Sequence, residues 1–132
     1  MAHILIVAHG NLADALLASA KMIVGEAGAE KVNCLNMTEE KSMDQFILEA
    51  KEILDANPND EFLILADVFG ASPCNSCLSV FRNSHYRLIT GVNLPILLEL
   101  LMNNDNKDLL DLWNSLIDSG KESIKGIFLP AQ

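Results

Sequence analysis

Apolar and polar residues alternate in blocks along the chain, and the length of each block predicts its local structure. Short continuous apolar runs are typical of strands that are buried on both faces of a parallel sheet. Longer segments with apolar residues three and four positions apart are typical of amphipathic helices. We therefore predict strands at residues 4–8, 31–37, 61–67 and 86–90, and helices at residues 11–24, 42–55, 73–81, 94–102 and 107–120.

Residues that start and stop helices flank several of these segments. Asn11 stands where it could cap the first helix, and Gly25 follows the last apolar residue of that helix. At the third helix, we expect Ser72 to be the N-cap and Pro73 to be the first helical residue, where a missing N–H costs nothing. A polar break is expected at residues 103–106, before the last helix.

The alternation of strands and helices predicts the arrangement of the whole chain. It is typical of an α/β protein with an open, doubly wound, mainly parallel sheet and helices on both faces. No internal repeat, low-complexity tract or linker divides the sequence, so we expect residues 1–132 to form a single domain. Residues 127–129 are apolar, and we expect either a last strand or a disordered tail there.

Composition narrows the classes of function. Half of the 132 residues are hydrophobic, enough for a sizeable core, and 18 acidic against 9 basic residues give a net charge of −9. Such a charge disfavours binding to nucleic acid or to an anionic membrane surface. The sequence shows neither a signal-peptide pattern nor an apolar run of the roughly 20 residues that cross a bilayer, so we expect a cytoplasmic protein. We expect the three cysteines to be reduced thiols.

Polar residues follow three of the predicted strands at their carboxyl ends. His9 and Gly10 follow the first strand, Asp67 ends the third, and residues 91–93, ending in Asn93, follow the fourth. Ligands of open α/β sheets bind beyond the carboxyl ends of the strands. We therefore expect these residues to meet on one rim.

His9 and Asp67 together predict nucleophilic chemistry at this rim. Neutral imidazole is a nucleophile near pH 7, and a carboxylate bound to one ring nitrogen leaves the lone pair of the other free to attack. A phosphoryl group on His9 would lie near the first helix, whose N-terminus favours negative charge. Two structural alternatives remain open: His9 is only a capped loop residue, and Asp67 only caps residues 68–72. We interpret His3 and His85 as surface residues.

Other reactive residues support weaker hypotheses. Ser72 lacks the Gly-x-Ser-x-Gly elbow of hydrolases, so capping is favoured over nucleophilic use, although it can offer a hydroxyl or N–H to a phosphate. Cys74 and Cys77 form a C-x-x-C at the start of a helix, which suggests a thiol-disulfide redox protein as an alternative. A zinc site that adds Cys34 and a histidine has no compact module spacing, and we predict no metal site.

Three segments together resemble the EIIA domain of the mannose family of the bacterial phosphoenolpyruvate-dependent sugar phosphotransferase system (PTS). They cover nearly the whole chain in order: residues 4–10 with the helix that follows, Asp67-Val68-Phe69-Gly70-Ala71-Ser72-Pro73-Cys74-Asn75, and Thr90-Gly91-Val92-Asn93-Leu94-Pro95. Ala71 departs from the family, where a second glycine is common.

The resemblance implies a histidine phosphocarrier. His9 would accept a phosphoryl group from the carrier HPr and pass it to a histidine of an EIIB component, with Asp67 orienting His9 and with Gly10, Ser72 and Asn93 at the phosphate-binding rim. Such a relay needs no cofactor, and its link to the membrane components EIIC and EIID is indirect. The family fold implies a homodimer in which a C-terminal strand, here residues 127–129, can be exchanged.

Besides the redox protein, a regulatory alternative remains open. In this alternative, the chain is a regulatory module of the same fold that is phosphorylated on His9 but passes the phosphoryl group to no partner. We expect the carrier because the sequence contains no attached DNA-binding or ATPase segment.

Overall fold

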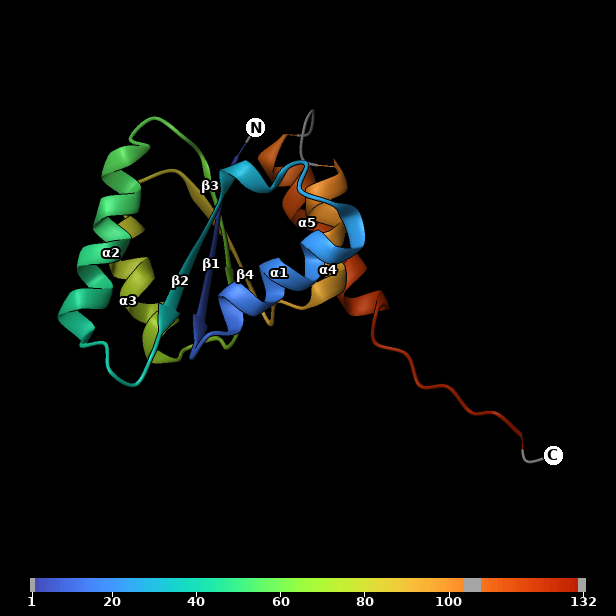
Figure 1. Ribbon diagram of the computed structural model, residues 1–132. Helices are drawn as coiled ribbons and strands as arrows, with labels where there is room; N and C mark the ends of the chain where they lie inside the picture. The colour runs from blue at the N-terminus through green and yellow to red at the C-terminus, as the bar shows by residue number, and fades with distance from the viewer. Residues whose placement is uncertain (1, 104–107, 131–132) are drawn as a thin grey trace.

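Four strands form one sheet in the order β2-β1-β3-β4, and all neighbouring pairs are parallel (Figure 1). The structure is a computed structural model that describes residues 2–103 and 108–130. The strands are β1 (His3–His9), β2 (Val32–Met37), β3 (Phe62–Ala66) and β4 (Tyr86–Thr90). Each predicted strand is confirmed to within one residue at either end, and the prediction of an open, mainly parallel sheet is confirmed.

Helices cover both faces of the sheet, as predicted for a doubly wound fold (Figure 1). One face carries α1 (Leu12–Val24), α4 (Leu94–Asn103) and α5 (Leu109–Glu122), and the other carries α2 (Met43–Ala56) and α3 (Ser72–Phe81). A short 3₁₀ turn, Ala29–Lys31, leads into β2. Residues 104–106 of the predicted polar break, and the expected helix start at residue 107, lie outside the described residues.

The alternation of side chains along β1 divides the core into two halves. Ile4, Ile6 and Ala8 pack toward α1, α4 and α5, whereas Leu5 and Val7 pack toward α2 and α3. Because β1 lies between β2 and β3, all five side chains are fully buried. Burial on both faces explains the continuous apolar run of β1. The same alternation puts the side chain of His9 on the face that α2 and α3 cover.

Two helix starts differ from the expectation. Asn11 occupies the N-cap position of α1, but its side chain makes no capping hydrogen bond. The prediction that Ser72 caps the third helix is wrong, because α3 begins at Ser72 itself and Ala71 is the N-cap. Ala71 has the extended backbone of a cap residue but no side-chain oxygen that could accept a capping hydrogen bond. The helix therefore begins one residue earlier than the capping pattern predicted.

His3 was expected at the surface, and this is wrong. Its side chain is buried, its ring packs on Phe62 with centroids 5.3 Å apart, and its imidazole hydrogen-bonds Asn33. One ring nitrogen lies 3.6 Å from a carboxylate oxygen of Asp60. The strands on either side of β1 cover this first residue, which the apolar pattern alone did not reveal. His85 is exposed, as predicted.

The end of the chain leaves the body after α5 (Figure 1). Residues 127–129 form no strand within the single chain, and Ile127, Phe128 and Leu129 are each more than 80% exposed. A last strand is therefore not formed by the chain on its own. Within the described ranges, the helices are all too short or too polar to span a membrane.

Candidate functional site

The strand order places a crevice at the end of β1. The chain passes from β1 to β2 on one side of β1, and β3 lies on the other side, so the strand order reverses between β1 and β3. Ligands of doubly wound sheets bind at such a switch point, beyond the carboxyl ends of the strands. His9 is the last residue of β1 and Asp67 follows the last residue of β3, so the fold places both at this crevice.

Three hydrogen bonds fix the position of Asp67. Its N–H donates to the carbonyl oxygen of Val7 over 3.2 Å, and its own carbonyl oxygen accepts from the N–H of Gly91 over 3.2 Å. The N–H of Val68 donates to its side-chain Oδ1 over 2.8 Å. Asp67 is therefore bound to β1, to the loop after β4 and to its own loop, and none of these three bonds involves His9.

The remaining carboxylate oxygen of Asp67 holds His9. Oδ2 lies 2.9 Å from the backbone nitrogen of His9, which donates to it, and 2.8 Å from the ring nitrogen Nδ1. A carboxylate can only accept hydrogen bonds, so Nδ1 carries the proton and Nε2 keeps the lone pair. The side chain of Asp67 is 10% exposed and that of His9 is 53% exposed. The ring nitrogen that keeps its lone pair is thus on the more exposed of the two side chains.

The same contacts determine the charge of Asp67. Burial raises the pKa of this carboxyl, but hydrogen bonds from the backbone and imidazole of His9 and from the N–H of Val68 lower it by more. The pKa of Asp67 therefore lies below its usual value. Because the group is ionised at neutral pH, it can hold the Nδ1 proton and stabilise positive charge on the ring.

Gly10 and Asn36 direct the chain from His9 into α1. Gly10 has a φ of +58°, which favours glycine, and its N–H donates to the carbonyl oxygen of Met37 over 2.9 Å. Asn36 Oδ1 accepts from the N–H of Ala13 over 3.2 Å and supplies the side-chain cap that Asn11 does not. The sequence pattern did not single out Asn36, although it is a polar residue near the carboxyl end of a predicted strand.

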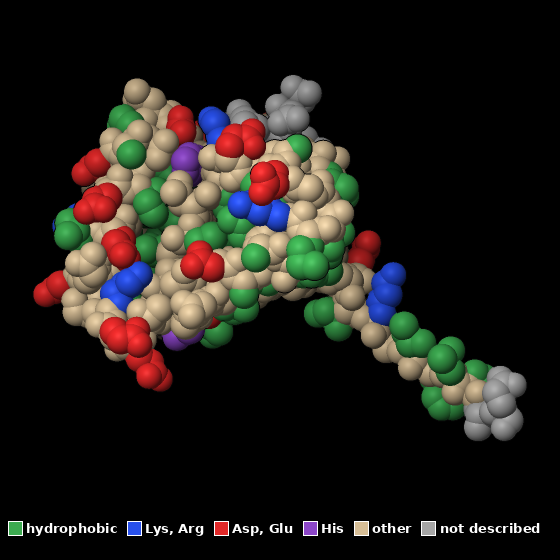
Figure 2. Space-filling view, in the orientation of Figure 1, with side chains coloured by type: hydrophobic (Ala, Val, Ile, Leu, Met, Phe, Trp, Pro, Cys, Tyr) green, Lys and Arg blue, Asp and Glu red, His purple; other side chains and the backbone are tan. Residues whose placement is uncertain are grey.

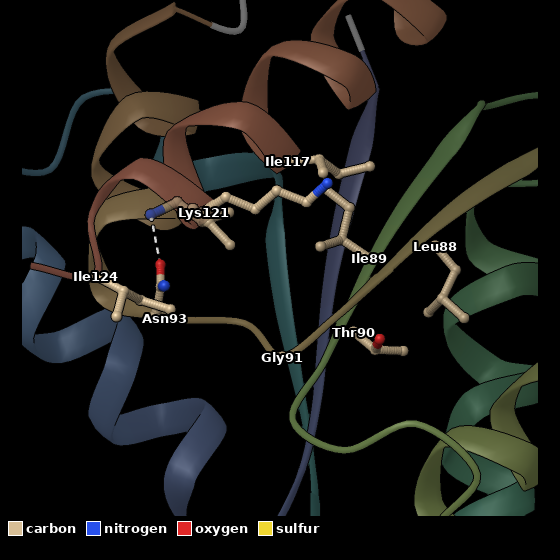
Figure 3. Close-up of a pocket in the computed structure, with 10 residues that line it drawn as sticks. Leu88, Ile89, Thr90, Gly91, Asn93, Ile117, Lys121 and Ile124 are labelled. Carbon is tan, nitrogen blue, oxygen red and sulfur yellow. Dashed lines mark hydrogen bonds between the residues drawn. The ribbon is translucent and has the colours of Figure 1, made fainter.

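Ser72 and Asn93 are on the rim but do not hydrogen-bond His9 in the described part of the chain. Ser72 is exposed, and its hydroxyl is not used for capping. The amide of Asn93 is occupied: Oδ1 accepts from the N–H of Ile96 over 3.0 Å, and Nδ2 donates to Ser123 Oγ over 3.3 Å. Figure 3 shows the first of these bonds, at the start of α4. Asn93 therefore holds α4 against the end of α5.

The cysteines lack the properties of a redox pair. Cys74 and Cys77 are 1% and 0% exposed, and all three cysteines are free thiols. Burial, together with the neighbouring Cys74, raises the pKa of the Cys77 thiol to about 12. Reactive thiols are accessible and have a lowered pKa. Cys74 and Cys77 are therefore helix-packing residues of α3, and nothing supports the redox alternative. In residues 2–103 and 108–130, no three His, Cys, Asp or Glu side chains are arranged to hold a metal ion.

Exposed apolar side chains flank the two site residues in sequence. Val68 and Phe69 directly follow Asp67 and are 53% and 76% exposed, and Leu12, three residues after His9, is 42% exposed. We call these three residues the apolar collar. Exposed apolar groups beside a reactive residue are typical of a surface that another protein covers.

Fold and site together define an α/β protein with an accessible, carboxylate-oriented histidine at the switch point of a parallel sheet. Residues 3–117 match the family described as the PTS system fructose IIA component, of the EIIA mannose type. The chain therefore belongs to the mannose family of PTS EIIA proteins, which are components of sugar phosphotransfer.

Relatives and solved structures agree with this assignment. The chain is 32% identical over 129 residues to the PTS system fructose-specific EIIA component of Bacillus subtilis, covering 95% of this chain and 86% of that protein. It is 31% identical over 127 residues to the PTS system mannose-specific EIIAB component of Escherichia coli K12, covering 94% of this chain but only 39% of the relative. The mannose/sorbose specific IIA subunit from Enterococcus faecalis has a similar structure, with a TM-score of 0.89, 27% identity and coverage of 99% and 98%.

Proposed function

We propose that His9 carries the phosphoryl group in this chain, accepting it from the phosphohistidine of HPr and passing it to a histidine of an EIIB component. The observation that supports this most directly is the 2.8 Å contact between Asp67 Oδ2 and His9 Nδ1, because it leaves Nε2 unprotonated and accessible. Through EIIB, the link to the membrane components EIIC and EIID is indirect.

The proposed step is an in-line exchange between two imidazoles. The Nε2 lone pair of His9 attacks the phosphorus, the N–P bond of the donor breaks, and its electron pair returns to the donor ring. The ring of His9 then carries both the Nδ1 proton and the phosphoryl group, and its positive charge is stabilised by Asp67. In the forward transfer, the Nε2–P bond breaks and the lone pair returns to Nε2. The reaction needs positioning and charge stabilisation, and every group involved belongs to the two proteins.

Gly10, Ser72 and Asn93 have different roles at the proposed phosphate-binding rim. Gly10 presents no side chain beside His9, and the exposed hydroxyl of Ser72 is free to donate to a phosphoryl oxygen. Asn93 acts indirectly, since both ends of its amide hold α4 and α5.

A stepwise phosphate transfer tests the proposal. The full chain is incubated with phosphoenolpyruvate, enzyme I and HPr, and its intact mass is recorded before and after EIIB is added. We expect one acid-labile phosphate that then moves to EIIB. Phosphate that is taken up but never passed on would indicate the regulatory module instead, and no uptake would contradict the proposed function.

The apolar collar is proposed to be the docking surface for the partner proteins. The net charge is −9, and acidic side chains are spread over the face that Figure 2 shows and gather over α2, so a partner surface that is not acidic is favoured. We expect Phe69→Ser to weaken transfer from HPr by about tenfold, mainly through a higher KM, because it removes the most exposed apolar side chain of the collar. Steady-state transfer kinetics measure this. Met22→Ser is the control, because Met22 is 89% exposed and lies near the C-terminal end of α1, outside the collar. An unchanged KM for Phe69→Ser would contradict docking here.

The chain is proposed to form a homodimer by strand exchange. β4 is an edge strand, and beside it lies a hollow of about 330 Å³ between β4, α4 and α5, which Figure 3 shows from Leu88 to Asn93. The tail offers Ile127, Phe128 and Leu129 as exposed apolar side chains. A second copy's tail could cover both the edge and the hollow. We expect light scattering to give a dimer for the full chain and a monomer for Phe128→Asp/Leu129→Asp. A dimeric double variant would contradict strand exchange.

A further inference from the structure

The segment from Val68 to Ala71, here called loop 68–71, joins Asp67 to α3 and is fastened at both ends. At the first end, the N–H of Val68 donates to Asp67 Oδ1. At the other end, Asn75 makes two bonds: its N–H donates to the carbonyl oxygen of Ala71 over 3.0 Å, and its side-chain Nδ2 donates to the carbonyl oxygen of Gly70 over 2.9 Å. We propose that Asn75 is a positioning residue for phosphoryl transfer and acts by holding loop 68–71 in shape. This inference rests on the proposed function of His9.

The need for such a bond follows from the way α3 begins. Ala71 is the N-cap and has no side-chain oxygen, and Ser72 makes no capping bond. Gly70, just before them, has a φ of +80°, so the loop turns sharply at a residue with little conformational preference. The side chain of Asn75 reaches back five residues and binds the carbonyl oxygen at this turn. In this bond the side chain accepts from no N–H of α3, so it is not a cap, but the bond links the loop to the first turn of the helix.

Two parts of the site are therefore held by different contacts. Asp67 is bound to Val7 on β1 and to Gly91 just after β4, so the pair of His9 and Asp67 has anchors that do not involve Asn75. Loop 68–71 carries Val68 and Phe69 of the apolar collar and leads directly to Ser72. Losing the contact of Asn75 should misplace the collar and the Ser72 hydroxyl while His9 remains oriented.

The test compares Asn75→Asp and Asn75→Ala with the wild type. Both variants lose the side-chain donor, and only the first adds a charge. Asn103→Asp is the matched control, because Asn103 is also exposed and its Nδ2 donates to a carbonyl oxygen, that of Glu99, over 3.0 Å at the other end of the molecule. We expect kcat/KM for phosphate uptake from HPr to fall between about tenfold and a hundredfold in both Asn75 variants. The misplaced collar should raise KM and the misplaced Ser72 should lower kcat, whereas both should stay unchanged in Asn103→Asp.

Two further measurements separate positioning from general damage. The ¹⁵N NMR signals of the His9 imidazole should still show a proton on Nδ1 in both Asn75 variants. Chymotrypsin should cleave after Phe69 faster than in the wild type, because a loosened loop fits a protease more readily. Wild-type rates in the Asn75 variants, a loss confined to Asn75→Asp, or a changed imidazole pattern would each overturn the role of Asn75. A wild type that takes up no phosphate would instead overturn the proposed function, and this role with it.

Discussion

Replacing His9 by glutamine is expected to abolish phosphate uptake from HPr. The glutamine amide can still donate to Asp67, but its nitrogen lone pair is delocalised into the carbonyl group, so it is not a nucleophile for phosphorus. The position is exposed at the end of β1, so the fold should be retained. Intact-mass measurement after incubation with phosphoenolpyruvate, enzyme I and HPr should give one acid-labile phosphate on the wild type and none on His9→Gln.

Two control variants make this result specific. His85→Gln changes another exposed histidine and should keep the phosphate. Cys74→Ala/Cys77→Ala should keep it as well, because both thiols are buried packing groups. Phosphate found on His9→Gln, or lost from a cysteine variant whose circular dichroism shows that it is folded, would show that the acceptor is another residue.

The sheet and the pairing of His9 with Asp67 could be predicted from the sequence for a physical reason. Strands buried on both faces appear as continuous apolar runs, and their ends are marked by the first polar residue, here His9 after Ala8 and Asp67 after Ala66. Parallel strands bring such ends together at one edge. A one-dimensional pattern is therefore enough to place these two residues on one rim.

Side-chain contacts that depend on tertiary packing could not be predicted from the apolar pattern. Asn36 caps a helix that begins 24 residues before it, and His3 is buried by neighbours from other strands. Asn75 binds Gly70 across the start of α3, where Ala71 is the N-cap although the capping pattern favours Ser72. In each case the residue type fits several local structures, and only tertiary packing selects one.

Asp67→Asn is expected to lower the rate of phosphate uptake about a hundredfold to a thousandfold while leaving His9 in place. The asparagine NH₂ can donate to Nδ1, which moves the ring proton to Nε2 and occupies the attacking lone pair. The variant also loses the negative charge that stabilises the phosphorylated ring. Rapid-quench kinetics with phospho-HPr measure the rate, and Asp55→Asn, an exposed acid on α2, is the control.

The same variant should change how stability depends on pH. Because the folded protein lowers the pKa of Asp67, the unfolded chain binds the proton more tightly. The stabilisation is fully present above the ordinary aspartate pKa of about 3.9 and is lost as the pH falls through the lower folded pKa. Urea unfolding should therefore show the wild type more stable than Asp67→Asn at pH 7, with the difference shrinking in acid. A difference that is constant with pH would mean that Asp67 acts by shape alone, and an unchanged rate would mean that it does not orient His9.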